Sequence, residues 1–564
     1  MSSIDFDEVL LHVGEKGRYQ NIMYYLLCIP ATLPAAFLAF SQVFVSASPE
    51  HWCKIPELEN LTGLMTLEEK KALSLPYSMK SDGRRVYSKC QMYDVNYTEI
   101  IESWLRLNKC QHGWIYDNKD YDSTLVTELD LVCDNSWWPS TSTTFFYVGS
   151  LFGNVVFGWI ADKWGRRTAF FAILFLEVIF SIATSFSPNY VIYTALRTVN
   201  GLFFPAIYQI PFILGNKTNC PWYILFQYFY YSIRFSFLAL ELMGPRYRTF
   251  AGMVICMFFA SGYLLRHWYT LSLATSVPFV LLFSYYWIIP ESPRWLLSKN
   301  RIDEAEVIVQ HMAKVNGRTN TGNVVLDIEA ENRSPPPSAT PMDLIRNRNI
   351  RKKFFILAFD WVANAVVYNG LSYNTTNLGV SDYLAFFIGG IVEIPSYVIT
   401  WYAMDRLGRR WVLCLTMLLG GVACVSLDAV WVTVCLAMIG KFGIAASFAV
   451  FYVFVGELLP TVLRSQAMGI ASFIAGIGLL TFPYIVHLAV YSRVLPLIIM
   501  GSLSVAGALT SVFLPETLNI HLPQTIEEGE LFGADFKLWS CPIIPKLVSI
   551  LLNVFARIDF YSLE

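Results

Sequence analysis

Long apolar runs alternate with polar segments along most of this chain. A helix needs about 20 mostly apolar residues to cross the hydrocarbon core of a bilayer. Several of the runs are somewhat shorter than this, so their boundaries are loose. The pattern predicts an all-α membrane protein with twelve transmembrane helices, at 22–47, 141–161, 169–187, 189–214, 249–265, 269–289, 354–373, 382–404, 411–427, 429–456, 466–488 and 493–514.

Basic residues gather in alternate loops between these runs. Basic loops of membrane proteins face the cytoplasm. The rule predicts that both termini are cytoplasmic and that the long polar segment 48–140 is extracellular. The residues that set this orientation are Lys163, Arg166, Arg167, Arg246, Arg248, Arg294, Arg301, the cluster 346–353, Arg406, Arg409, Arg410 and Arg464.

Three motifs occur twice, in the same order, at matching helix ends. An Asp-x-x-Gly-Arg-Arg loop stands at 162–167 and 405–410. A segment that begins with Glu and ends with Arg stands at 241–248 and 457–464. A Pro-Glu-Ser or Pro-Glu-Thr segment follows the last helix of each half, at 290–292 and 515–517. Parallel repeats of this kind are typical of transporters built from two related bundles.

The repeat defines the expected domains. A polar segment containing Ser334-Pro-Pro-Pro337 separates the halves and reads as a linker. We predict a cytoplasmic N-terminus at 1–21, a six-helix bundle at 22–290 with its extracellular loop at 48–140, a cytoplasmic linker at 291–353, a second six-helix bundle at 354–516 and a cytoplasmic tail at 517–564.

Composition agrees with this class and excludes others. Apolar residues make up 55% of the 564 residues and charged residues only 15%, against about 25% charged in soluble domains. The net charge of −2 indicates no particular partner, and no stretch of the sequence offers a basic face for nucleic acid. The seven histidines show no metal-ligand spacing, and no phosphate loop or Ser-His-Asp set is recognisable. We therefore expect no enzyme activity, no metal and no cofactor; the sequence leaves the oligomeric state open.

The long loop also carries the marks of an oxidising compartment. Four of the eleven cysteines lie there, and an even number in a polar loop favours disulfides without fixing their pairing. The same loop has Asn-x-Thr sequons at Asn60 and Asn96, which predict a glycoprotein. The disulfide candidates are Cys53, Cys90, Cys110 and Cys133.

The motifs together resemble a known family. The two Asp-x-x-Gly-Arg-Arg loops are similar to the signature of the major facilitator superfamily, and 290–296 (Pro-Glu-Ser-Pro-Arg-Trp-Leu) is similar to its sugar porters and its organic cation/anion transporters. The loop sequences 110–117 and 128–133 resemble only the latter, solute carrier family 22-like branch, and its insect-like members most. The resemblance runs from about residue 5 to 532. It implies alternating-access transport of small organic solutes at the plasma membrane.

Substrate charge is the next expectation. Mammalian cation members of this family carry an Asp in helix 11 and anion members an Arg, whereas the matching position here is Gly476. Charged side chains inside the membrane are costly and mark functional sites. Asp360 and Glu393 lie inside the seventh and eighth runs, so we expect organic cations, including amines and amino-acid derivatives. An organic anion transporter is the alternative within the class.

Aromatic rings complete the expected substrate site. Trp361 and Tyr368 lie seven residues apart on one helical face and can stack on a cation. Lys441 can instead neutralise Asp360 in a structural pair, which is an equally weighted reading of that acid. The predicted substrate-binding residues are Tyr208, Asp360, Trp361, Tyr368, Glu393, Phe451 and Tyr452.

The repeated loops predict a gate. An acid in the loop can cap a helix N-terminus, where the helix dipole favours an anion, and the arginines can bridge to Glu241 and Glu457. Such a latch closes the cytoplasmic side and breaks when the halves rock. The predicted gating residues are Asp162, Arg166, Arg167, Glu241, Arg248, Asp405, Arg409, Arg410, Glu457 and Arg464.

The repeat also measures two irregularities. Asp405 and Glu457 are 52 residues apart, whereas Asp162 and Glu241 are 79 apart, and 215–238 is the segment that interrupts helix 4. Helix 5 is in turn short for a bilayer near Leu265. A non-transporting isoform disrupted by these two features is therefore the alternative outside the transporter class.

Overall fold

The computed structural model describes residues 18–19, 38–56, 66–79, 85–94, 106–215, 266–299, 301–318, 342–424, 430–518, 520, 523 and 525–534. Several residues and segments that the sequence singled out lie outside these ranges. Glu241, Arg248, both sequons, most of the segment 215–238, the run 249–265 and the tail after 534 lie outside the described residues. Asp162 and Tyr208 lie in described helices, but their side chains are outside the description.

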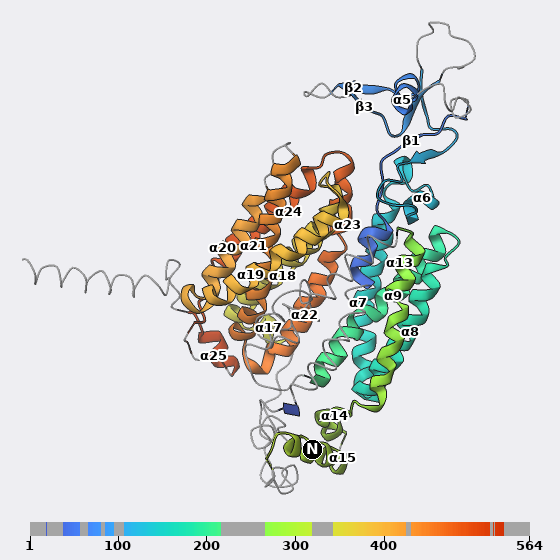
Figure 1. The fold of residues 1–564 in the computed structure, drawn as a ribbon. Helices are drawn as coiled ribbons and strands as arrows, with labels where there is room; N and C mark the ends of the chain where they lie inside the picture. The colour runs from blue at the N-terminus through green and yellow to red at the C-terminus, as the bar shows by residue number, and fades with distance from the viewer. Residues whose placement is uncertain are drawn as a thin grey trace, which may run out of the picture.

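The first half is a group of packed helices (Figure 1). Consecutive long helices of this group run antiparallel, and a helical stretch at 38–45 packs among them. The last membrane helix changes to the tighter 3-10 form after Ser276, where Pro278 follows. The elements are α7 (Trp138–Trp164), α8 (Arg166–Ser185), α9 (Tyr190–Gly215), α13 (Trp268–Ala274), η3 (Val277–Trp287), α14 (Pro293–Ser298) and α15 (Ile302–Val315).

The second half is a separate bundle beside the first in Figure 1. The chain runs through the bundle and then returns to its base in a short helix, α25. The elements are α17 (Asp343–Arg346), α18 (Arg348–Tyr373), η4 (Asn374–Asn377), α19 (Asp382–Leu407), α20 (Arg409–Ala423), α21 (Val430–Leu458), α22 (Thr461–Leu479), α23 (Phe482–His487), η5 (Leu488–Val490), α24 (Leu495–Ser511) and α25 (Ile526–Leu531).

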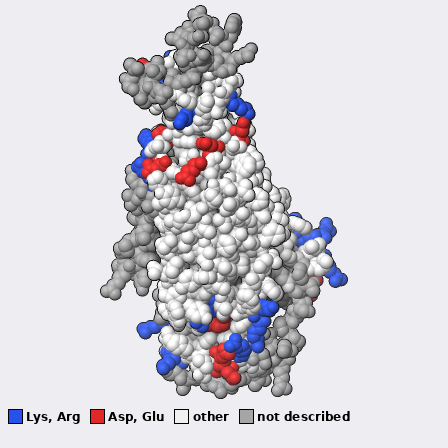
Figure 2. Space-filling view, turned by 90° about the vertical axis from the view of Figure 1, so that its right-hand side faces the viewer, with Lys and Arg blue, Asp and Glu red and all other residues white. Residues whose placement is uncertain are grey.

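The predicted apolar runs coincide closely with these helices. Ten of the twelve runs lie on described helices, and the run 22–47 is described only in its last part. Among the described residues, seven stretches are long and apolar enough to cross a membrane, and α24 is a shorter apolar helix. On the face shown in Figure 2, most charged side chains lie towards the two ends, with a broad uncharged band between them. That band is the surface expected against lipid.

Small residues set the close approach of the helices. Gly149 and Gly153 on α7 face α9, and Gly201 on α9 faces α7. A Cβ atom at any of the three positions would collide with the backbone of the opposite helix. Close backbone contact at small residues is how membrane helices gain packing energy without a hydrophobic driving force. The same device recurs in the second half, where Gly443 of α21 lies against Gly420 of α20.

The polar loop before α7 forms a small β-rich unit. Its three two-stranded antiparallel sheets pair β1 with β6, β2 with β3 and β4 with β5. Disulfides join Cys53 to Cys110 and Cys90 to Cys133, so the connectivity that the sequence leaves open is decided here. The elements of this unit are β1 (His51–Cys53), α5 (Leu67–Ser74), β2 (Tyr77–Met79), β3 (Arg85–Tyr87), β4 (Gln91–Asp94), β5 (Arg106–Lys109), β6 (Trp114–Tyr116), α6 (Leu125–Glu128) and η2 (Cys133–Asn135).

This unit and the linker helices lie at opposite ends of the molecule (Figure 1). We call the end with the β-rich unit the disulfide side and the end with α14 and α15 the linker side. The halves meet towards the disulfide side. The Tyr121 hydroxyl donates to Asp382 at 2.7 Å, and the Tyr373 hydroxyl donates to the carbonyl of Ala39 at 2.6 Å. Phe44 stacks on Tyr383 with ring centroids 5.1 Å apart.

Candidate functional site

Four polar side chains from α18, α19 and α21 meet inside the second half. Glu393 lies 3.2 Å from the Nζ atom of Lys441. The hydroxyl of Tyr368 lies 3.3 and 3.4 Å from the two carboxylate oxygens, and that of Tyr397 lies 3.3 Å from one of them. Glu393 is 1% exposed and Lys441 is 4% exposed. We call these four residues the Glu393 cluster.

The cluster explains how two charges are tolerated in a buried position. An isolated buried carboxylate costs several kcal/mol or more, so such groups are paired and hydrogen-bonded. Here the ammonium of Lys441 supplies the opposite charge, and two phenol hydroxyls supply further donors to Glu393. The carboxylate of Glu393 is therefore already paired with a cation, the ammonium group of Lys441. An incoming cationic group must displace or share the position of Lys441.

Aromatic rings pack beside the cluster. Trp361 lies edge-on to Phe451 and Tyr452, with ring centroids 5.6 and 5.1 Å apart. Phe448 lies between Tyr452 and Tyr368, at 5.4 and 5.7 Å. The structure thus brings together four of the aromatic residues expected at the substrate site. Phe448 was missed by the sequence interpretation, although its spacing of three and four residues from Phe451 and Tyr452 indicates a shared helical face.

Asp360 belongs to a different place. Thr510 and Ser511 on α24 each donate a hydroxyl hydrogen bond to it at 2.7 Å, and it is fully buried. The prediction that Lys441 neutralises Asp360 is wrong, because Lys441 pairs with Glu393. The eight residues from Asp360 to Tyr368 correspond to about 12 Å along the helix. The two acids therefore do not share one cluster.

The repeated loops have the same construction in both halves. Gly165 and Gly408 end one helix and begin the next with φ values of +98° and +91°. Positive φ values of this size favour glycine, because a residue with a Cβ atom is strained in that backbone conformation. A carboxylate then caps the following helix. Glu291 accepts from the N–H groups of Arg166 and Arg167 at 2.9 and 3.1 Å.

The second loop repeats this cap with Glu516. Its carboxylate accepts from the N–H groups of Arg409 and Arg410 at 2.8 and 3.2 Å. The prediction that the loop's own acid caps the helix is therefore wrong for this loop. Asp405 instead lies 3.7 Å from the guanidinium of its neighbour Arg409, one turn away. The third repeated motif, Pro-Glu-Ser or Pro-Glu-Thr, supplies the capping carboxylate because it returns to the same helix end.

The arginine side chains tie each half together on the linker side. Arg409 places Nε 3.2 Å from Glu457, which also accepts from the hydroxyl of Thr517 at 2.5 Å. The guanidinium of Arg167 lies over the ring of Tyr286 at 4.4 Å. Arg410 is fully buried and donates to the carbonyl of Leu514 at 3.5 Å. Each of these contacts lies within one half.

Comparisons with a protein-family model and with known transporters show which family the chain belongs to. The family described as "Sugar (and other) transporter" matches residues 91–216 and 232–528. The carcinine transporter of Drosophila melanogaster is 39% identical over 575 residues, which cover 96% of this chain and 81% of that protein. Organic cation transporter 1 of Caenorhabditis elegans is 38% identical, covering 94% of this chain and 89% of that protein. The beta-alanine transporter of Drosophila melanogaster is 39% identical, with 95% and 91% covered.

The chain belongs to the organic cation transporter branch of the major facilitator superfamily. It is a multi-pass membrane transporter of small organic solutes and not an enzyme. Its fold agrees with this membership. The xylose transporter XylE of Escherichia coli, in a partially occluded inward-open conformation, matches with a TM-score of 0.53 over 88% of this chain and 99% of that chain, at 14% identity. A likeness at this identity concerns the fold alone.

One detail of the family match concerns the expected insertion. The two matched ranges leave residues 217–231 of the transporter unmatched. These residues lie inside 215–238, the segment that the internal repeat marks as extra. The structure adds that α9 continues to Gly215. Helix 4 of the transporter therefore has its regular form up to the point where the segment begins.

Several partners in the transporter site carry no sequence motif. Tyr397 lies one helical turn after Glu393, and that spacing is a signal that could have found it. The hydroxyls that bind Asp360 could not be found this way, because Thr510 and Ser511 are 150 and 151 residues distant in sequence. Glu291 and Glu516 were recognised as repeated residues, but only the folded chain shows which helix each one caps.

Proposed function

We propose that this transporter carries small organic cations and amine-bearing zwitterions across the plasma membrane by alternating access. The relatives named above as carcinine, organic cation and beta-alanine transporters support this, since carcinine and beta-alanine both carry an amine. The disulfide side faces the exterior and both termini face the cytoplasm. The Glu393 cluster supplies the counter-charge for the substrate amine.

The observation that carries the proposal is the position of Glu393. It is a nearly fully buried acid bordered by aromatic side chains. A carboxylate next to aromatic rings is the chemistry that recognises an ammonium group. Lys441 extends this to zwitterions, because its ammonium can meet the carboxylate of a substrate whose amine meets Glu393. We assign Trp361, Tyr368, Phe451 and Tyr452 to the aromatic wall and leave Asp360 as a structural acid.

We also propose a gating role for the repeated loops. The caps formed by Glu291 and Glu516 fix the helix ends that approach each other when the linker side closes. The ion pair of Arg409 and Glu457 holds one such end in place. The contact of Tyr121 with Asp382 closes the opposite, disulfide side in the described conformation. Alternating access then consists of exchanging one closed side for the other.

Uptake of labelled compounds into cells that express the chain tests the proposal. Labelled carcinine, beta-alanine and tetraethylammonium represent zwitterionic and cationic solutes, and labelled benzoate represents an anion. We expect uptake of the first group above the level of untransfected cells and no uptake of benzoate. Uptake of benzoate alone would show an anion transporter instead.

The unmatched segment requires a second arm of the same experiment. Deleting residues 215–238 shortens the separation of Asp162 and Glu241 from 79 to 55 residues, close to the 52 residues between Asp405 and Glu457. We expect this variant to take up the cations at least as fast as the full chain. Absence of uptake from both forms, when both reach the cell surface, would contradict a transport function.

A further inference from the structure

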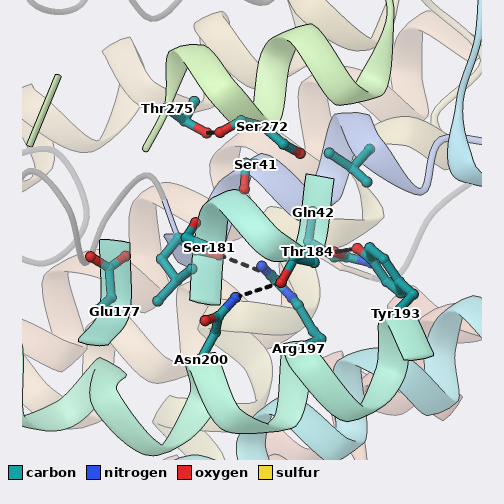
Figure 3. Close-up of a pocket in the computed structure, with 12 residues that line it drawn as sticks. Ser41, Gln42, Glu177, Ser181, Thr184, Tyr193, Arg197, Asn200, Ser272 and Thr275 are labelled. Carbon is teal, nitrogen blue, oxygen red and sulfur yellow. Dashed lines mark hydrogen bonds between the residues drawn. The ribbon is translucent and has the colours of Figure 1, made fainter. Parts of the chain in front are cut away.

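A second polar site lies in the first half, away from the Glu393 cluster. Twelve residues from the stretch 38–45, α8, α9, α13 and the residue that follows α13 line a cavity of about 20 Å³ (Figure 3). Ten of them have polar or charged side chains. They are Ser41, Gln42, Glu177, Ser181, Thr184, Tyr193, Arg197, Asn200, Ser272 and Thr275.

Most of the polar atoms around this cavity are already bound. The hydroxyl of Tyr193 donates to Gln42 at 2.7 Å, and Arg197 donates to the carbonyl of Leu38 at 2.8 Å. The amide of Asn200 donates to the hydroxyl of Thr184 at 3.0 Å. These bonds fix the walls, as Figure 3 shows for the side chains that point inwards.

Three buried polar atoms of the lining residues have no hydrogen-bond partner among the described residues. Among the described residues, no hydrogen bond is made by Oε2 of Glu177, Oδ1 of Asn200 or Nε of Arg197. The three residues are 2%, 1% and 5% exposed. A buried polar atom without a partner costs about 1–3 kcal/mol. Such atoms are normally satisfied by bound water or an ion when a polar cavity offers the room.

The size of the cavity limits what can satisfy them. About 10–15 Å³ is enough for one water molecule, whereas sites for small organic molecules occupy several hundred Å³. The cavity therefore takes water and a small ion, and the transported solute binds elsewhere.

The layout of the oxygens favours a proton over a metal ion. Hard metal ions need several oxygens converging within about 2.6 Å. The lining residues of α8 extend from Glu177 to Thr184, which is about 10 Å of helix. A proton needs only one oxygen and a water to deliver it. The charged or titratable lining groups are Glu177 on α8 and Arg197 and Tyr193 on α9, while the lining of α13 and of 38–45 is neutral.

We propose that Glu177 is a proton-binding site whose occupancy is coupled to transport. A hydronium ion in the cavity delivers the proton: one of its O–H bonds breaks, an O–H bond forms at Oε2, and a neutral water molecule is left. On release, the O–H bond at Oε2 breaks and the proton re-forms an O–H bond on that water. The coupling to transport rests on the proposed function, whereas proton binding to Glu177 does not.

Infrared spectroscopy of the purified full chain tests proton binding by itself. We expect a carbonyl band of a protonated carboxyl group that rises and falls with pH. Glu177→Gln removes this band, and Glu177→Asp keeps one that titrates at a different pH. Glu306→Gln changes a buried glutamate on α15, outside the cavity, and leaves the band intact. A titrating band that survives Glu177→Gln unchanged overturns the proposal.

Uptake of labelled carcinine into proteoliposomes tests the coupling. Because one pH unit is a tenfold change in proton activity, an imposed gradient should change uptake by up to about tenfold per unit. Glu177→Gln should abolish this dependence, and Glu177→Asp should restore it. Uptake that depends on external sodium and not on pH overturns the coupling while leaving the transport function in place. Absence of uptake in every condition overturns the coupling together with the proposed function, and the infrared result still decides the site.

Discussion

The ammonium of Lys441 lies 3.2 Å from the carboxylate of Glu393, and neither side chain is more than slightly exposed. The pair joins α21 to α19 across the interior of the second half. Removing one partner of such a pair leaves a buried charge without compensation, which typically destabilises by about 3–5 kcal/mol. The same pair occupies the position that we assign to the substrate amine. We therefore expect both stability and transport to depend on this pair, and variants can separate the two effects.

Glu393→Gln should reduce cation uptake by about tenfold or more, because the counter-charge is lost while Lys441 remains. It should also lower the thermal unfolding temperature of the purified protein. The double variant Glu393→Gln with Lys441→Met removes both charges, so we expect it to regain most of the stability and none of the uptake. Full recovery of uptake in the double variant would show that Glu393 acts only as the partner of Lys441.

Gly408→Ala should destabilise the second half. Its φ of +91° costs an L-residue roughly 1–2 kcal/mol, and the new Cβ would collide with the carboxylate of Glu516 that caps α20. Gly469→Ala on α22 is the matched control, because its Cβ meets nothing within 4 Å. This control should be stabilising by about 0.5–1 kcal/mol. Thermal unfolding in detergent measures both, and equal shifts would contradict the role of the loop.

Tyr121→Phe should open the disulfide side more often. The lost hydrogen bond to Asp382 joins the two halves, and bonds to charged groups contribute about 1.5–3 kcal/mol. The rate at which an impermeant thiol reagent labels a cysteine placed at Asn369 should rise by about tenfold or more. Tyr116→Phe removes a similar bond, to Asp130 at 2.9 Å, but inside one half. An equal increase in that variant would show a general loosening of the loop.

Replacing Cys53 and Cys110 together by serine should loosen the β-rich unit. The disulfide closes a separation of 57 residues, and disulfides typically stabilise by about 2–4 kcal/mol. We expect the loop to be cut faster by protease added outside intact cells. Cys435→Ser is the control, because Cys435 is a free, exposed cysteine on α21. Protection of the loop in both variants would argue against a structural role for this bridge.

The amino-acid sequence determined the class and the plan of the molecule. Apolar runs long enough for a bilayer have few alternatives to helices, because unpaired backbone groups cannot be left in lipid. Ten of the twelve predicted runs accordingly coincide with described helices. The motif at 162–167 and its copy at 405–410 likewise predicted two related loops, because a glycine between two helix ends is a local requirement. Glu393 stood out for a local reason too, since a charge inside an apolar run is costly wherever it folds.

Only the tertiary structure decided which side chains contact one another. The sequence suggested Asp360 as the partner of Lys441, whereas the packing of the folded helices brings Lys441 to Glu393. Asp360 and Trp361 are neighbours in the chain, yet Asp360 binds α24 and Trp361 packs on α21. The cap of Glu516 on α20 spans 107 residues. Such contacts depend on how helices distant in sequence are oriented, and apolar periodicity fixes a helix without fixing its neighbours.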